Sequence, residues 1–333
     1  MVDASPAFDV GDGDGPPPPR TLITERSRVD RIYRGVVTTA GGFTFVVLFL
    51  IGLFLFLKGL PSVRKDGLLT FLTTKQWDIT KTHVHFGIVA LLYWTVVIAM
   101  IALVTAVPVS IATALCITEC APPALARILV SVIDLLAAIP SVIFGIWGLF
   151  FFQNDVAGVA RWMSVHMAFI PIFSSNVKIY TSSALVAGLV VGIMVLPIVT
   201  SISRQVFALA PAGEREGALA LGATRWDVIR TVVLPFGRGG VIGAIFLGMG
   251  RALGETIAVY LIISPILATS PHILQAGANS IAAFITLRFG SGDKLYLSSL
   301  LAAGFALFVV TLAANLAGAW VVRRSRSGTG VEI

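Results

Sequence analysis

Residues 216–235 read EGALALGATRWDVIRTVVLP and separate two strongly apolar runs in the second half of the chain. Their charged side chains cannot lie in the hydrocarbon of a bilayer, yet their pattern is typical of helices. Pro211 suits the first turn of one helix, Gly222 is a helix breaker, and Thr224 with the acidic residue three positions later has the spacing of a capping box for a second helix. The stretch therefore predicts a helix–turn–helix at one face of a membrane, within residues 206–235, which we call the elbow.

The composition is that of a membrane protein. Hydrophobic residues make up 56% of the 333 residues and charged residues 12%, against about a quarter charged in soluble domains. Little sequence is left for a soluble enzyme, and residues 1–30, rich in Pro and Gly, are predicted to be a disordered tail. The two cysteines, Cys116 and Cys120, share a helix face with no histidine nearby, so they are interpreted as small apolar side chains and no metal site is expected.

Six apolar runs are long enough to cross hydrocarbon. They occupy residues 35–57, 86–118, 128–152, 179–203, 239–264 and 295–322. The second run exceeds one simple span, and we expect it to cross in its first two thirds and then bend. The third is expected to kink at its proline, and the shorter stretch 163–173 is predicted to be interfacial or re-entrant. The second helix of the elbow is expected to end at Leu234-Pro235. The fold class is therefore all-α integral membrane, with a transmembrane domain at 31–325 and a tail at 326–333.

The distribution of Lys and Arg indicates the orientation of the chain. Of the 24 Lys and Arg residues, fourteen lie in the two tails, the second-to-third turn and residues 204–238 around the elbow, whereas nine lie in the opposite loops and Arg251 lies inside the fifth run. Because six spans place both ends on one side, both termini and the elbow are predicted to be cytoplasmic.

Arg251 and Glu255 are the candidate site in the membrane. Arg251 follows Pro235 by 16 residues, which is roughly 24 Å along a helix and deep in the bilayer. A charge there is functional by default, and Glu255 at i+4 is expected to hold the guanidinium on the same helix face. A guanidinium stays charged and binds tetrahedral oxyanions in a bidentate manner. The pattern thus favours an oxyanion path.

Other interpretations of these residues stay open. The two charges can instead form an intrahelical ion pair that steadies the bundle. Gly250 and Gly254 form a small-xxx-small pair, which allows a helix or a ligand to approach the backbone closely. Asp134, a third ionisable residue in the apolar runs, is interpreted as a packing or capping residue.

The elbow resembles the cytoplasmic signature loop of ABC importer permeases, which have the MetI-like fold. Without insertion, the loop's pattern is matched by Glu216, Gly217, Ala218, Gly222, Val232, Leu234 and Pro235. Gly217 departs from the pattern, where Ala is usual, and is expected to cost about 1 kcal/mol of helix stability. The resemblance implies that the elbow, with Thr224 and Trp226, docks in a groove of a separate ATPase.

Further segments extend the resemblance to the phosphate-specific ABC permeases over roughly residues 30–325. They are DLLAAIPSVIFG at 134–145, MVLPIVTSISR at 194–204 and GRALGETIAV at 250–259, the last resembling the PstC rather than the PstA subunit. The resemblance implies an importer of inorganic phosphate in the bacterial plasma membrane. Its partners would be a PstA-like permease, two PstB-like ATPase subunits that carry ATP and Mg, and an extracytoplasmic PstS-like binding protein. It also implies that Arg251 and Glu255 line the anion path.

The chain itself lacks an ATPase motif. A Walker A loop needs Gly directly before Lys, and none of the six lysines has one. We therefore expect a transporter subunit that is not an enzyme and carries no cofactor. The alternatives are an ABC permease for molybdate, sulfate or phosphonate, an ion-coupled secondary transporter, and a sensor that recruits a kinase. The secondary transporter predicts an inverted repeat, which is not seen, and leaves the elbow unexplained.

Overall fold

The computed structural model describes residues 28–74, 77–78, 85–290 and 294–325. The chain divides into two units, residues 1–50 and 51–333. In the first unit the described residues belong to one helix, α1 (Arg28–Asp66), which continues into the second unit. The predicted tails at 1–30 and 326–333 lie outside the described residues, apart from the first three residues of α1.

The described residues of the second unit form helices and one small hairpin. The helices after α1 are α2 (Leu68–Thr73), α3 (Val89–Leu115), α4 (Pro123–Ala138), α5 (Ser141–Trp147), α6 (Gln153–His166), α7 (Ala184–Ala208), α8 (Ala212–Ala220), α9 (Arg225–Val228), α10 (Leu234–Leu253), α11 (Ile257–Ile262), α12 (Ile281–Arg288) and α13 (Lys294–Ser325). Three π-helical turns interrupt them: η1 (Cys116–Cys120), η2 (Gly148–Phe152) and η3 (Ile229–Val233). The antiparallel hairpin pairs β1 (Trp77–Asp78) with β2 (His85–Phe86).

Six helices in the described part of the chain are long and apolar enough to cross a membrane. They are Val29–Lys65, Val89–Cys120, Ser141–His166, Ala184–Ala208, Arg225–Leu253 and Lys294–Arg324. The predicted all-α fold with six spans is therefore confirmed. The last predicted run, 295–322, agrees with α13 to within three residues at either end. The expectation that only the first two thirds of the second run cross is wrong, because α3 runs through Pro108 into η1 without a break and the whole of Val89–Cys120 is one candidate span.

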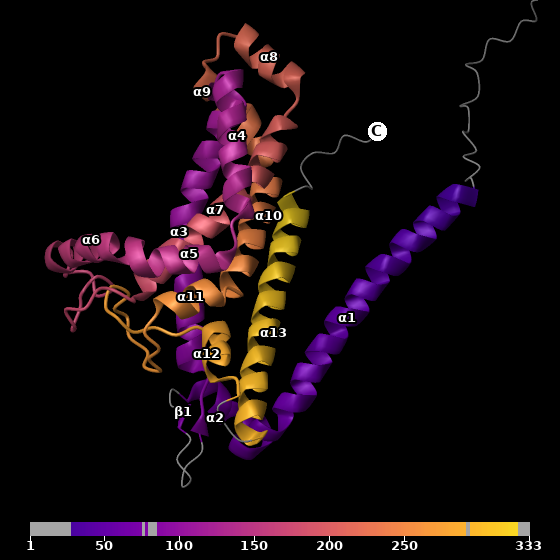
Figure 1. The fold of residues 1–333 in the computed structure, drawn as a ribbon. Coiled ribbons are helices and arrows are strands. Elements are labelled where there is room, and N and C mark those ends of the chain that lie inside the picture. The colour runs from indigo at the N-terminus through magenta and orange to yellow at the C-terminus, as the bar shows by residue number, and fades with distance from the viewer. Residues whose placement is uncertain (1–27, 75–76, 79–84, 291–293, 326–333) are drawn as a thin grey trace, which may run out of the picture. The chain divides into compact units, whose positions relative to one another are not determined.

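The third predicted run, 128–152, is wrong in its bounds. The chain leaves the helical conformation at Ile139 and Pro140, which are extended, and a new helix begins at Ser141. Proline disfavours the helical conformation of the residue before it, so the expected kink is a complete break. The helix that follows continues through Arg161 to the end of α6, and it includes the start of the stretch that was expected to be interfacial. Figure 1 shows α5 and α6 extending sideways from the bundle that contains α10 and α13.

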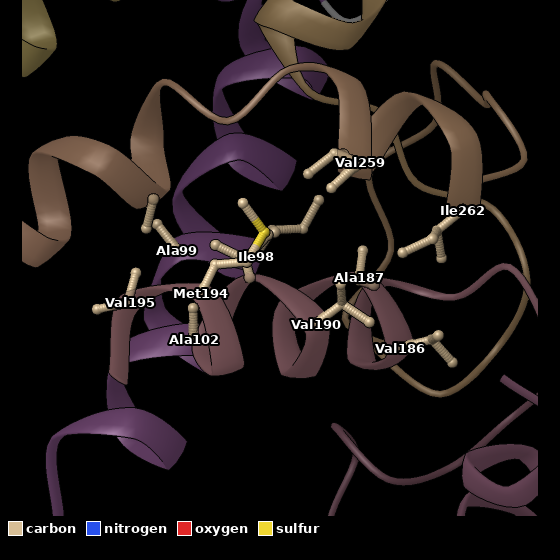
Figure 2. Close-up of a cluster of buried hydrophobic side chains, with 14 of the residues drawn as sticks. Ile98, Ala99, Ala102, Val186, Ala187, Val190, Met194, Val195, Val259 and Ile262 are labelled. Atoms are coloured by element: carbon tan, nitrogen blue, oxygen red, sulfur yellow. The ribbon is translucent and has the colours of Figure 1, made fainter. Parts of the chain in front are cut away.

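The core of the second unit is built around α3 and α7, which pack against each other more than any other pair of elements. Gly188 and Gly192 allow this, because a Cβ on either would lie 2.6 Å from Ile101 or 2.7 Å from Thr105 on α3. Small residues four apart let two helix backbones approach closely. Figure 2 shows the apolar cluster that they make with α11. Its labelled side chains are Ile98, Ala99, Ala102, Val186, Ala187, Val190, Met194, Val195, Val259 and Ile262.

α10 lies against this core and runs antiparallel to α13. Positions along α10 meet positions in reverse order along α13, with Gly243 near Val322 and Gly250 near Asn315. The start of α10 therefore lies beside the end of α13. In Figure 1, α8 and α9 lie at this end of the second unit, and α2 and β1 lie at the opposite end. The elbow and the hairpin thus mark the two faces of this unit.

Candidate functional site

The first half of the elbow is α8, which ends in a turn centred on Gly222. The N–H of Gly222 donates to the carbonyl of Leu219 at 2.9 Å, and the N–H of Ala223 donates to the carbonyl of Ala218 at 3.1 Å. This pair of bonds is the Schellman motif, which needs a left-handed residue at the position of Gly222. Gly222 has a φ of +85°, which glycine adopts at little cost. The predicted helix break at Gly222 is confirmed.

The second half of the elbow begins with the predicted capping box. The backbone N–H of Asp227 donates to Oγ1 of Thr224 at 3.2 Å, and the backbone N–H of Thr224 donates to Oδ2 of Asp227 at 2.9 Å. The hydroxyl of Thr224 also donates to Oδ2 at 2.6 Å. Together these bonds satisfy donors that a helix start leaves unpaired, so they hold α9 at a defined angle to the turn.

The predicted end of the second helix at Leu234-Pro235 is wrong. Helical backbone continues from α9 through η3 into α10, and the whole stretch Arg225–Leu253 forms one helix. Pro235 lies in the first turn of α10, directly after the wide turn of η3. A π-helical turn inserts one extra residue, which gives the chain room to accept a proline without stopping the helix.

The elbow presents most of its predicted coupling residues outward. Exposed positions are Glu216, Gly217, Gly222, Thr224, Trp226 and Pro235. Trp226 is 63% exposed and the neighbouring Leu221 is 90% exposed. On the opposite side, Ala218 and Leu234 pack against a buried cluster that includes Phe207 and Val233. Large apolar side chains exposed on a charged elbow form a surface suited to contact with a partner protein.

Arg251 and Glu255 lie at the break between α10 and α11. Arg251 is exposed in the last turn of α10, and Glu255 is 8% exposed, just before α11. The expected i+4 pair is wrong: no ion pair joins these two residues, and Oε1 of Glu255 instead accepts a bond from the N–H of Ala258 at 3.4 Å. The reason is that α10 ends at Leu253, so Glu255 lies beyond the helix and is not on the helix face that carries Arg251. The carboxylate instead compensates the N-terminal end of α11.

The close approach expected at the two glycines holds for one of them. A Cβ on Gly250 would lie 3.0 Å from Oδ1 of Asn315 on α13, whereas a Cβ on Gly254 would meet only the backbone of its own helix. Asn315 is an exposed polar residue in the middle of a membrane helix, and sequence reasoning missed it because it carries no charge. Its side chain lies beside Gly250, the residue that precedes Arg251 in α10. Asp134 is exposed on α4 and caps neither end of that helix.

A polar contact that sequence reasoning also missed holds the elbow from inside. Nη2 of Arg215 on α8 lies 3.3 Å from Oε1 of Glu119 in η1. The two residues lie far apart in the sequence, and no motif in either segment indicates that they form a pair. Among the described residues, no group of three or more His, Cys, Asp or Glu side chains is arranged to hold a metal ion.

Comparison with known proteins places this chain in one class of membrane protein. Residues 120–327 match the family model described as the binding-protein-dependent transport system inner membrane component. Among solved structures, the chain resembles that of a bacterial alginate ABC transporter in complex with an alginate-bound periplasmic protein, with a TM-score of 0.59 and 18% identity over 90% of this chain and 98% of that chain. That likeness supports the fold alone. The chain is thus a multi-pass plasma membrane component of an ABC transport system.

The curated relatives narrow the class. The phosphate transport system permease protein PstC 2 of Mycobacterium tuberculosis is 38% identical over 87% of this chain and 90% of its own length. PstC of Xylella fastidiosa (strain 9a5c) is also 38% identical, over 86% of this chain and 88% of its own. The chain belongs to the PstC family of phosphate transport permeases. Members of this family are transport subunits and not enzymes.

Proposed function

We propose that this chain is the PstC-type permease subunit of an ATP-driven importer of inorganic phosphate. The observation that carries the proposal is the 38% identity with PstC permeases across nearly the whole chain, which includes the elbow and the segment around Arg251. A permease for molybdate, sulfate or phosphonate would use the same guanidinium chemistry. The names of the relatives favour phosphate.

In this proposal the anion path passes the break between α10 and α11. Arg251 is exposed there, although it lies nearly a full α10 away from the elbow. A permanent positive charge at that depth compensates an oxyanion that has lost its water. Glu255 is buried against the start of α11 rather than on the guanidinium, so Arg251 is left available to an incoming anion. Asn315, beside Gly250, offers amide donors at the same level of α10.

The elbow is the surface that we propose couples the chain to its ATPase. Glu216, Gly217 and Trp226 face outward, while Ala218 and Leu234 fasten the elbow to the buried cluster beneath it. Gly222 and Thr224 set the angle between α8 and α9. A groove on a PstB-like ATPase dimer would cover the exposed Leu221 and Trp226, removing apolar surface from water. ATP and Mg would bind that partner, and this chain needs no cofactor of its own.

We further propose that a PstA-like permease completes the path and that a PstS-like protein delivers phosphate from outside. The excess of Lys and Arg on the elbow side supports a cytoplasmic position for both termini and the elbow. The hairpin of β1 and β2, at the opposite end of the second unit from the elbow, would then face the binding protein.

The test is reconstitution of the complete complex in proteoliposomes. Labelled phosphate is expected to accumulate only when ATP is on the elbow side and the binding protein is on the other side. Excess unlabelled phosphate should abolish accumulation, whereas sulfate, molybdate and phosphonates should not. Accumulation that follows one of those anions instead would change the substrate, and accumulation driven by an ion gradient without ATP would refute the proposal.

A further inference from the structure

Arg215 joins three segments at the base of the elbow. It extends from α8, its Nη2 donates to the backbone carbonyl of Phe207 near the end of α7 at 2.6 Å, and the same nitrogen lies 3.3 Å from Oε1 of Glu119 in η1. α7 and α8 are neighbours along the chain, but η1 is the continuation of α3. The guanidinium therefore links the elbow to a helix that is distant in sequence.

The contact is shielded from water. The side chains of Arg215 and Glu119 are 23% and 11% exposed. Oε1 of Glu119 is buried and has no hydrogen-bonding partner among the described residues, so the guanidinium charge is what compensates it. Electrostatic attraction at reduced exposure is screened less than at the open surface. Displacing Arg215 would leave a largely buried carboxylate uncompensated, which is costly.

Apolar packing around the pair also joins the elbow to the ends of α3 and α7. Beneath the elbow, a buried cluster brings together Ala114 from α3, Phe207 from α7, Val228 from α9 and Val233 from η3. The outer face of the same elbow carries the exposed Leu221 and Trp226. The elbow thus has one face open to a partner and one face fastened to the ends of α3 and α7.

The position of Glu119 indicates which helices would move if the elbow were displaced. Glu119 lies in the wide turn η1, which ends α3, and the chain turns at once into α4. π-helical turns occur frequently at functional sites. A displacement of the elbow would therefore move the junction of α3 and α4. That junction is connected to the core, because α3 is the main packing partner of α7.

We propose that Arg215 and Glu119 are positioning residues that transmit movement of the elbow to the α3–α4 junction, so that ATP use on the partner is converted into movement of the membrane helices. This inference rests on the proposed coupling function of the elbow. It adds to that function a pair of residues on the inner side of the elbow, with side chains that are 23% and 11% exposed.

The first experiment measures phosphate transported per ATP hydrolysed in assembled complexes. Glu119→Gln removes the charge with little change in shape. It is expected to leave assembly and ATP hydrolysis in place and to lower the transport-to-hydrolysis ratio about tenfold, within the range usual for coupled sites. Glu119→Asp keeps the charge and should recover part of the ratio. Asp155→Asn, which removes the charge of an exposed carboxylate on α6 outside the elbow, is the matched control and should match the wild type.

A second experiment keeps the ion pair intact. Cys120 is exposed and adjacent to Glu119, and Cys116 is the only other cysteine in the chain. In a Cys116→Ser background, an environment-sensitive thiol probe on Cys120 of the complete complex should change its emission when ATP is added. Arg215→Gln should remove that change while hydrolysis continues.

The outcomes separate the two proposals. If the wild-type complex imports no phosphate, the proposed function fails whatever the variants do. If it imports phosphate but Glu119→Gln keeps the wild-type ratio, the positioning role is refuted. If Glu119→Gln does not assemble, the probe decides: silent Cys120 emission during active transport overturns the inference, and an ATP-dependent change supports it.

Discussion

Two glycines in the elbow, five residues apart, should respond in opposite ways to the same substitution. Gly222 has a φ of +85°, and a Cβ added there would meet no atom within 4 Å. The cost of Gly222→Ala is therefore the left-handed backbone alone, about 1–2 kcal/mol. Gly217 lies inside α8, where a Cβ also meets nothing, so Gly217→Ala should stabilise α8 by up to about 1 kcal/mol.

The assay is amide hydrogen exchange in the purified complex. The amides of Gly222 and Ala223 donate the two bonds of the turn, so their exchange reports its opening. Gly222→Ala should accelerate exchange at Ala223 about five- to thirtyfold, and Gly217→Ala should slow it. Asn tolerates the left-handed conformation better than other residues with a Cβ, so Gly222→Asn should fall between Gly222→Ala and the wild type.

Transport should follow the same order if the elbow must be rigid to couple. Gly222→Ala is expected to insert normally and to transport less phosphate per ATP than Gly217→Ala. Equal effects of the two Gly→Ala substitutions on exchange would contradict the assignment of the turn. Normal transport with a destabilised turn would contradict the role of the elbow.

Three further predictions test the cap, the core and the orientation. Thr224→Ala should lower the stability of the start of α9 by about 1 kcal/mol and speed hydrogen exchange of the Asp227 amide about fivefold, whereas Thr224→Ser should do neither. Unchanged exchange in Thr224→Ala would show that the cap does not stabilise α9. Gly192→Ala should lower the free energy of unfolding by about 1–3 kcal/mol because its Cβ meets α3, and Gly158→Ala, where the Cβ meets nothing, should not; equal thermal midpoints would refute the close crossing. An impermeant maleimide should label Cys120, on the elbow side, in inside-out vesicles and not in intact cells; the reverse would invert the topology.

The parts of the fold that depend on local chemistry could be predicted from the sequence. The turn at Gly222 terminates α8 through a bond from Gly222 to the carbonyl three positions back and a bond from Ala223 to the carbonyl five positions back. Thr224 caps α9 through a residue three positions on. Such signals are complete within one turn. The proline before Ser141 was also recognised, although its effect is a full break and not a kink.

The parts that depend on helix ends and on packing could not be predicted. The pairing of Arg251 with Glu255 required α10 to continue past Leu253, and no residue there fixes that end as a cap does. The contact of Arg215 with Glu119 joins two segments separated by the third and fourth spans. Only the packing of α7 against α3 brings them together, and no periodicity in either segment encodes it.

The central claim is that the exposed guanidinium at the end of α10 belongs to the phosphate path, and one comparison tests it directly. Arg251→Gln keeps the size and polarity of the side chain and removes the charge. Arg238→Gln is the matched control, because Arg238 is an exposed arginine near the other end of the same helix. Arg251→Lys keeps the charge without the planar fork and should be impaired to an intermediate degree.

The measurement is the initial rate of ATP-driven uptake of labelled phosphate per assembled complex in proteoliposomes. Removing a charge that would pair with a desolvated oxyanion in the path costs about 2 kcal/mol or more, so Arg251→Gln should slow uptake about thirtyfold or more. Arg238→Gln should stay near the wild-type rate. Wild-type uptake by an assembled Arg251→Gln complex would contradict the account and leave Arg251 a structural residue of the bundle.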